Sequence, residues 1–120
     1  MTLRAEFEPL LIGPRGFCRD PESCAASWDH YSEEVMQRQV RLSEEWLRHQ
    51  KRLKHFSHKF SSYGHKHRVE DWHSGKVPNN YVSNGAFIIA AVRLGFLMKR
   101  IRNGPNAIFN ITPVTEPRNV

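Results

Sequence analysis

The stretch YVSNGAFIIAAVRLGF, residues 81–96, decides the fold that we expect for this chain. Ser83 or Asn84 can cap a helix over residues 84–94, and Gly95 can end it in the left-handed backbone that glycine adopts readily. Apolar side chains cover every face of this helix, which is typical of a helix buried in a core. DNA bases are read by Arg, Lys, Asn or Gln side chains, and within the helix proper only Arg93 is of that kind. The sequence therefore predicts a core helix here rather than a DNA-recognition helix.

The start of this helix is also a candidate anion site, formed by Ser83, Asn84 and Gly85. Free N–H groups at a helix N-terminus attract phosphate or carboxylate, and Gly85 would let such an anion approach the backbone closely. An ordinary helix cap explains the same three residues, and we favour it.

The flanking sequence predicts one further helix and a β-hairpin. A serine at position 61 or 62 can cap a helix over residues 63–72. Residues 96–102 and 107–112 have the pattern of strands, and the turn residues Asn103-Gly104-Pro105-Asn106 join them into a hairpin. Helix, helix and hairpin follow one another in a winged-helix-like order.

Residues 28–60 contain neither Gly nor Pro, and their apolar side chains recur near the 3.6-residue period of a helix. One amphipathic helix of that length would extend about 50 Å at about 1.5 Å per residue. A globular domain of this size has a radius of gyration of only about 14 Å. We therefore expect the helix to protrude, to break at a point that the sequence does not reveal, or to pack against a second copy in a homodimer. The apolar positions are Trp28, Tyr31, Val35, Leu42, Trp46, Leu53, Phe56 and Phe60.

Together these elements predict an α+β protein with a long N-terminal amphipathic helix, two shorter helices and a C-terminal β-hairpin. The 120 residues suit a single domain, with residues 1–19 as an extended arm and residues 113–120 as a flexible tail. No apolar run approaches the roughly 18 residues of a membrane span, and the N-terminus lacks a signal-peptide pattern. We therefore expect a cytoplasmic protein without a membrane partner. Cys18 and Cys24 are too few for a four-cysteine zinc site, and we expect reduced thiols.

Charge is the strongest functional signal in the sequence. The chain has 18 Lys and Arg against 12 Asp and Glu, a formal net charge of +6, which favours anionic partners. No Asp or Glu lies between Trp46 and Val69. A surface that follows phosphates explains so long a basic run, and a solvated basic face is the alternative. The candidate binding residues are Arg48, Lys51, Arg52, Lys54, His55, His58, Lys59, Lys66 and Arg68.

The histidines raise the question of a metal site. Tetrahedral zinc accepts imidazoles at such spacings, but it usually binds them together with cysteines or in an H-E-x-x-H motif, and neither occurs here. The neighbouring Lys and Arg side chains would also repel a cation. The candidate ligands would be His55, His58, His65, His67 and His73. We nevertheless predict no metal and no cofactor.

A metal-free ribonuclease is the enzymatic interpretation. Such an enzyme needs a general base, a general acid and cations that stabilise the phosphorane. Tyr63, His65, His67 and Arg68 offer these groups within six residues. A basic histidine-rich segment offers them by chance as well, so the sequence favours a protein without enzymatic activity.

Three motifs carry a resemblance to known proteins: YGHKHRVEDW, YVSNGAFIIAAVRLGF and GPNAIFNI. Over residues 63–111 the chain resembles a family of small bacterial proteins, some of them carried on mobile elements. The resemblance implies a bacterial or phage-related setting and implies no activity.

Three functions remain open from the sequence. The first is a small nucleic-acid-binding accessory protein that uses the Lys-, Arg- and His-rich face. The second is a phage- or plasmid-type inhibitor that covers an acidic or nucleic-acid-binding surface of a host defence complex, which needs only the same positive face. The third is the metal-free ribonuclease. We favour the first.

Overall fold

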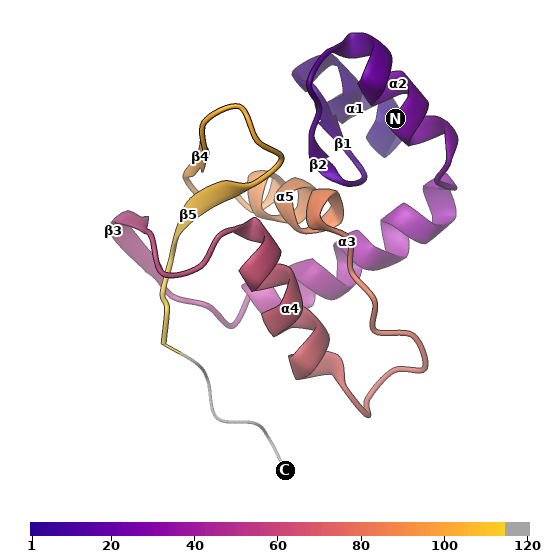
Figure 1. Ribbon diagram of the computed structural model, residues 1–120. Coiled ribbons are helices and arrows are strands. Elements are labelled where there is room, and N and C mark those ends of the chain that lie inside the picture. The colour runs from indigo at the N-terminus through magenta and orange to yellow at the C-terminus, as the bar shows by residue number, and fades with distance from the viewer. Residues whose placement is uncertain (115–120) are drawn as a thin grey trace.

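The computed structural model describes residues 1–114, in which five α-helices, a short 3-10 helix and five strands alternate along the chain (Figure 1). Residues 115–120 lie outside the described part, and with them most of the predicted tail. The elements are α1 (Leu3–Phe7), η1 (Glu8–Leu10), β1 (Ile12–Gly13), β2 (Gly16–Phe17), α2 (Pro21–Asp29), α3 (Glu33–Leu47), β3 (Arg52–Ser57), α4 (Ser62–His73), α5 (Asn84–Arg93), β4 (Met98–Arg100) and β5 (Ala107–Ile111).

Helix α5 is the centre of the core, as the sequence predicts. Every side chain from Asn84 to Ala91 is buried, and α3, α4 and the β1–β2 hairpin all contact this helix. Ser83 is the N-cap, and its Oγ accepts a hydrogen bond from the N–H of Ala86 at 3.1 Å. Gly95 follows the helix with φ of 80°. An apolar helix of this kind is stable only when it is enclosed, and the other elements enclose it.

The prediction of an extended arm over residues 1–19 is wrong. This segment forms α1, η1 and the antiparallel β1–β2 pair, and Leu3 and Phe7 are buried in the core. The β1–β2 turn closes on the start of α5, where the N–H of Gly85 donates to the carbonyl of Pro14 at 3.0 Å. A Cβ atom at Gly85 would overlap the carbonyl oxygen of Gly13, so only glycine permits this approach.

The long helix predicted over residues 28–60 is also wrong. Ser32 begins a separate helix, α3, because its Oγ accepts from the N–H of Val35 at 3.1 Å. Helix α3 has 15 residues, and after a turn the chain continues as β3. The absence of Gly and Pro does not make a helix continuous, because a serine followed by two glutamates can begin a new helix. Among the described residues no helix of about 50 Å exists, so the reason for expecting a dimer is lost.

The sheet has three antiparallel strands in the order β3–β5–β4. The predicted hairpin forms, with Met98 opposite Phe109, but β3 joins its other side, so the winged-helix-like arrangement with a single C-terminal hairpin is wrong. Strand β3 is irregular: Arg52 pairs with Ile111 and Ser57 with Phe109. Within residues 1–114, no helix has the length and apolar character that crossing a bilayer requires.

Candidate functional site

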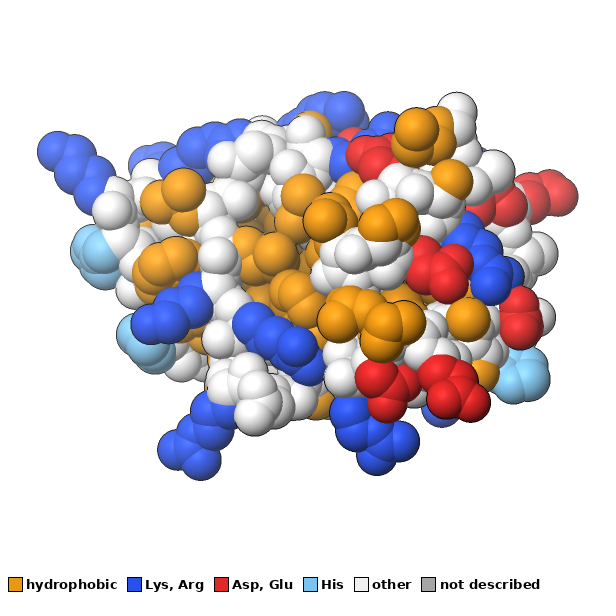
Figure 2. Space-filling view, turned by 90° about the horizontal axis from the view of Figure 1, so that it is seen from above, with side chains coloured by type: hydrophobic (Ala, Val, Ile, Leu, Met, Phe, Trp, Pro, Cys, Tyr) orange, Lys and Arg blue, Asp and Glu red, His pale blue; other side chains and the backbone are white. Residues whose placement is uncertain are grey.

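The fold separates the charges of the chain into two regions. Residues 1–45 contain nine Asp and Glu against five Lys and Arg, whereas residues 46–114 contain two against twelve. Figure 2 shows the consequence in space: acidic side chains lie on the right, the side of α1 and α2 in Figure 1, and none is visible on the left, the side of the sheet. The sheet therefore presents an excess of positive charge to solvent.

The exposed cations of the sheet and its flanks form what we call the basic sheet surface. No acidic side chain of residues 1–114 forms an ion pair with them. Three of them, His58, Lys99 and Arg102, line a hollow of about 290 Å³ whose lining also includes Ser61, Ile101 and Ile108. It brings the end of β3 and the β4–β5 hairpin together. The basic sheet surface consists of Lys51, Lys54, His55, His58, Lys59, Lys99 and Arg102.

Arg102 has an unusual backbone for its residue type. Its φ is 49°, in the left-handed region that is unfavourable for side chains other than Gly, Asn and Asp. Asn103 and Gly104, which follow Arg102 in the same turn, adopt this conformation more easily than arginine does. A strained residue of this kind points to a role for its side chain beyond forming the turn.

The predicted binding residues divide into an exposed group and an internal group. Arg48, Lys51, Lys54, His55, His58 and Lys59 are exposed. Arg52 is exposed as well, but its guanidinium stacks on the Phe96 ring at 3.9 Å and donates to the carbonyl of Leu94 at 2.5 Å. Arg52 thus fastens β3 to the end of α5 and has less freedom to contact a ligand.

Arg68 and Lys66 are directed inward. Arg68 lies over the rings of Trp46 and Phe60, at 4.8 and 4.7 Å, and donates to the carbonyl oxygens of Thr112 and Val114. Lys66 is buried, with its Nζ 3.2 Å from Oε2 of Glu70. These two cations hold the C-terminal strand and α4 in place.

His65 belongs to the aromatic core rather than to a catalytic site. It is 1% exposed and stacks on the Phe87 ring at 5.4 Å. Its Nδ1 accepts from the guanidinium of Arg68 at 3.1 Å, because arginine can only donate. Burial, and secondarily the charge of Arg68, lowers the pKa of His65 to about 3. His65 is therefore neutral in the folded protein near neutral pH.

The other groups of the ribonuclease interpretation lie apart from His65. His67 and Tyr63 are on the outer side of α4, with their rings 4.7 Å apart, and His67 pairs with Glu70 at 3.0 Å. The two histidines therefore do not form an acid and base pair around one hollow. Cys24 is no nucleophile either, because burial and its hydrogen bond with Cys18 raise the pKa of Cys24 to about 12.

The remaining histidines also lie in different environments. His55 and His58 are exposed near β3, whereas His73 is buried and its Nε2 is 2.9 Å from the carbonyl oxygen of Leu42. Within residues 1–114, no three His, Cys, Asp or Glu side chains lie together in a way that could hold a metal ion.

The candidate anion site at the start of α5 has its N–H groups occupied by the chain itself. Gly85 donates to Pro14, and Ala86 donates to Ser83. The side-chain Nδ2 of Asn84 lies 3.0 to 3.2 Å from three oxygens, those of Arg15, Pro105 and Asn106. An ordinary cap, enclosed by the β1–β2 turn and the hairpin, describes this helix start.

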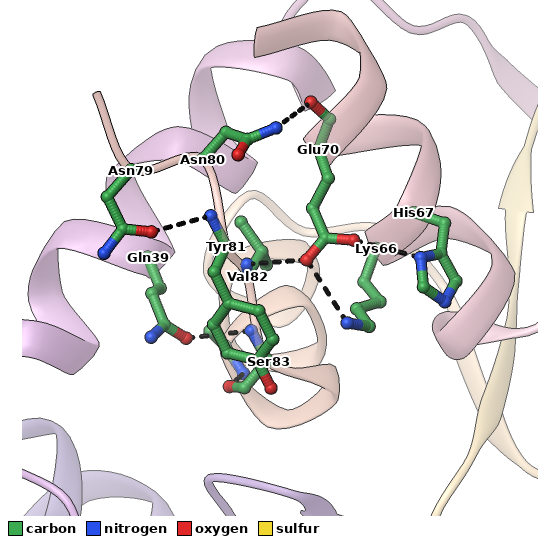
Figure 3. Close-up of polar contacts among 10 residues, drawn as sticks. Gln39, Lys66, His67, Glu70, Asn79, Asn80, Tyr81, Val82 and Ser83 are labelled. Carbon is green, nitrogen blue, oxygen red and sulfur yellow. Dashed lines mark hydrogen bonds and ion pairs between the residues drawn. The ribbon is translucent and has the colours of Figure 1, made fainter. Parts of the chain in front are cut away.

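A second hollow, of about 740 Å³, lies beside that helix start. We call it the tyrosine hollow, because its lining includes all three tyrosines of the chain. Around it, a network centred on Glu70 fixes the loop before α5 (Figure 3). Its Oε2 accepts from the N–H of Val82 at 3.0 Å as well as from Lys66. The lining of the tyrosine hollow includes Arg15, Tyr31, Tyr63, Lys66, Tyr81 and Asn106.

Our sequence interpretation missed several of these residues, namely Lys99, Arg102, Arg15, Tyr31 and Tyr81. One signal for the first two is present in the sequence: no Asp or Glu occurs between residues 72 and 114, so the basic region continues far beyond Val69. The gathering of three tyrosines, at positions 31, 63 and 81, has no local signal because they come from three separate segments.

No protein-family model, no curated protein and no solved structure matches this chain.

Proposed function

We propose that the protein binds nucleic acid through the basic sheet surface, as a non-enzymatic accessory protein. The observation that carries the proposal is the set of exposed Lys and Arg side chains on β3, β4 and their flanks, with no acidic partner within residues 1–114. Cations arranged in this way contact phosphates and release counterions, and this contributes most of non-specific affinity for nucleic acid.

Edge protection is the alternative explanation for these charges. Strands β3 and β4 are the two edges of the sheet, and lysines or irregular pairing on edge strands prevent association with other sheets. Protection of this kind does not require a strained arginine at position 102, nor a hollow with Ile101 and Ile108 between the cations. Both features favour a surface that receives a ligand.

Salt dependence tests the proposal directly. In a Lys54→Gln, Lys99→Gln double variant, we expect weaker binding and a slope of log K against log salt that is smaller by about 1.4 to 1.8, since each lost phosphate contact contributes about 0.7 to 0.9. Because both side chains are exposed, thermal unfolding should stay unchanged. The measurement is fluorescence anisotropy with labelled DNA and RNA at several salt concentrations.

A charge-matched control separates local contacts from overall charge. Arg41 and Lys76 are exposed and lie outside the sheet, on α3 and in the loop after α4. An Arg41→Gln, Lys76→Gln variant should keep the wild-type slope. Wild-type protein that binds neither DNA nor RNA at about 50 mM salt, where phosphate contacts are strong, would overturn the proposal.

A further inference from the structure

The tyrosine hollow presents aromatic rings to solvent in a way that ordinary core packing does not. Tyr63 is 53% and Tyr81 48% exposed, and Tyr31, at the start of the α2–α3 connection, lines the same space. Its volume of about 740 Å³ lies in the usual range for sites that take small organic molecules. Exposed aromatic faces around a concave surface are suited to stacking on a planar group.

The backbone that carries Tyr81 is fixed although it is neither helix nor strand. Three successive N–H groups each donate to a side-chain oxygen: Tyr81 to Asn79 at 3.2 Å, Val82 to Glu70 at 3.0 Å and Ser83 to Gln39 at 2.8 Å. Figure 3 shows these side chains converging on the loop from both sides. Because this backbone is already fixed, little backbone entropy is lost when a ligand stacks on the Tyr81 ring, so the loop is preorganised for binding.

The charges around the hollow select an anionic ligand. Lys66 Nζ lies 4.6 Å from the centre of the Tyr81 ring and 5.5 Å from that of Tyr63, and Arg15 lines the same space with an exposed side chain. No acidic residue is among the lining residues. Lys66 is paired with Glu70 at 3.2 Å, so the charge that faces a ligand is that of the exposed Arg15. An aromatic cage for a quaternary ammonium ion would use similar rings, but Arg15 would repel such a ligand.

The hollow adjoins the basic sheet surface. Ser61 lines the hollow of about 290 Å³ in the basic sheet surface, and Tyr63 lines the tyrosine hollow. Both residues belong to the first turn of α4 and its cap. Likewise, Ile108 lines the first and Asn106 the second, two residues apart at the start of β5. A strand of nucleic acid that follows the cations of the sheet therefore reaches the tyrosines within a short distance.

We propose that the tyrosine hollow takes one unstacked base, with its phosphate, from a single-stranded nucleic acid. The faces of Tyr63 and Tyr81 stack on the base, and Arg15 contacts the phosphate. Oδ1 of Asn84, another lining residue, is buried without a hydrogen-bond partner within residues 1–114. Bases in a duplex are paired and stacked, so the hollow gives a preference for single strands. This inference rests on the proposed nucleic-acid binding and specifies its substrate class.

A leucine at position 81 tests the stacking. Tyr81→Leu keeps an apolar cover over Lys66 but removes the ring face, and Tyr81→Phe keeps the ring. For T and U oligonucleotides of about 12 nucleotides, we expect Tyr81→Leu to weaken binding roughly 5- to 100-fold and Tyr81→Phe to bind as the wild type does. A duplex of equal length should bind all three proteins alike. The salt slope should not change, because no phosphate contact is lost.

Fluorescence of a 2-aminopurine base in the single strand gives an independent readout. Stacking quenches this base, so we expect quenching by the wild type and by Tyr81→Phe but not by Tyr81→Leu. Thermal unfolding checks that the fold is kept; if Tyr81→Leu is unstable, Tyr63→Leu takes its place because Tyr63 is exposed on α4. The separate T and U strands distinguish DNA from RNA as the ligand.

The outcomes separate this inference from the proposed function. One outcome is salt-dependent binding of both single strands and duplex that neither leucine substitution changes. This outcome overturns the proposal for the tyrosine hollow alone and leaves the proposal for the basic sheet surface in place. An equal loss of single-strand and duplex binding in a folded Tyr81→Leu protein also overturns it, because stacking on one unpaired base has no effect on a duplex. Absence of binding to every probe overturns both proposals.

Discussion

The polar groups at the start of α5 are hydrogen-bonded within the chain, whereas those of the basic sheet surface are exposed to solvent. At the start of α5, the N–H groups of Gly85 and Ala86 are satisfied by the chain, and glycine allows the β1–β2 turn to lie against the helix. On the basic sheet surface, the cations point to solvent without an acidic partner within residues 1–114, and Arg102 keeps an unfavourable backbone. The first arrangement stabilises the fold. In the second, the charged side chains remain available to contact a partner. Substitutions at the start of α5 should therefore change stability, and substitutions on the basic sheet surface should change binding.

The largest effect is expected from a charge placed in the enclosed region. Ile88 is fully buried at the centre of α5, and Ile88→Asp would bury a carboxylate without a partner, which destabilises by several kcal/mol, about 5 or more. The variant should be unfolded at 25 °C by circular dichroism. A folded Ile88→Asp protein that had lost only nucleic-acid binding would break the comparison and restore a recognition role for α5.

The pH dependence of stability tests whether His65 is enclosed in the core. Its pKa falls from an ordinary 6.5 to about 3 on folding, so below pH 6.5 the unfolded chain binds a proton that the native protein does not. Stability therefore decreases as pH falls from about 6.5 toward 3, by about 2 kcal/mol at pH 5 and about 3 kcal/mol at pH 4 from this group.

A His65→Phe variant isolates this contribution, because the other histidines are present in both proteins. Urea unfolding at a series of pH values should give the variant a shallower loss of stability below pH 6.5, whatever its stability at pH 7. Parallel curves for the two proteins would mean that His65 is accessible to protons and that the core is less enclosed than its 1% exposure indicates.

Adding one methyl group at Gly85 sharpens the contrast between a crowded and an ordinary helix start. Ala normally stabilises a helix by about 1 kcal/mol relative to Gly, but a Cβ here overlaps the Gly13 carbonyl, and we expect Gly85→Ala to lose about 3 kcal/mol. Gly64 is the matched control in the first turn of α4, where the nearest neighbours of a Cβ would be atoms of the Phe60 side chain, the closest at 3.2 Å. Gly64→Ala should stay within about 1 kcal/mol of the wild type in thermal unfolding.

The smallest effect on stability is expected at Arg102. Arg102→Gly relieves the left-handed backbone, whereas Arg102→Gln keeps that strain and loses the same charge. We expect the glycine variant to be more stable than the glutamine variant by about 1 kcal/mol. Both should lower the salt slope for nucleic acid by about 0.7 to 0.9. If the slope is unchanged in both variants, Arg102 serves the turn and not the ligand.

Local signals predicted some elements well and misled us on others. Ser83 and Gly95 bound α5 where the sequence places its cap and its end, and the Asn103–Asn106 turn joins β4 and β5 as expected. Residues 52–57 form a strand instead of a helix, because they pair with β5, more than 50 residues further along the chain. Periodicity within a short window contains no information about that partner.

The candidate site was predicted in part for the same reason. The acid-free run after Trp46 identifies a basic region from composition alone. Composition does not reveal that Arg68 turns inward onto Trp46 and Phe60, or that Lys66 is paired with Glu70. Those positions follow from which face of α4 packs against the core, and the four consecutive basic residues at positions 65–68 cover all faces of this helix.

The sequence by itself determined local structure and total charge. It predicts a helix that has to be buried because it is apolar on every face, a hairpin turn, and an excess of positive charge in the second half of the chain. Only the tertiary structure decided which cations remain in solvent, that β3 completes the sheet, and that three distant tyrosines line one hollow. Caps, turns and charge counts act within a few residues or over the whole chain, whereas a surface is formed by segments that meet only after the core around α5 has closed.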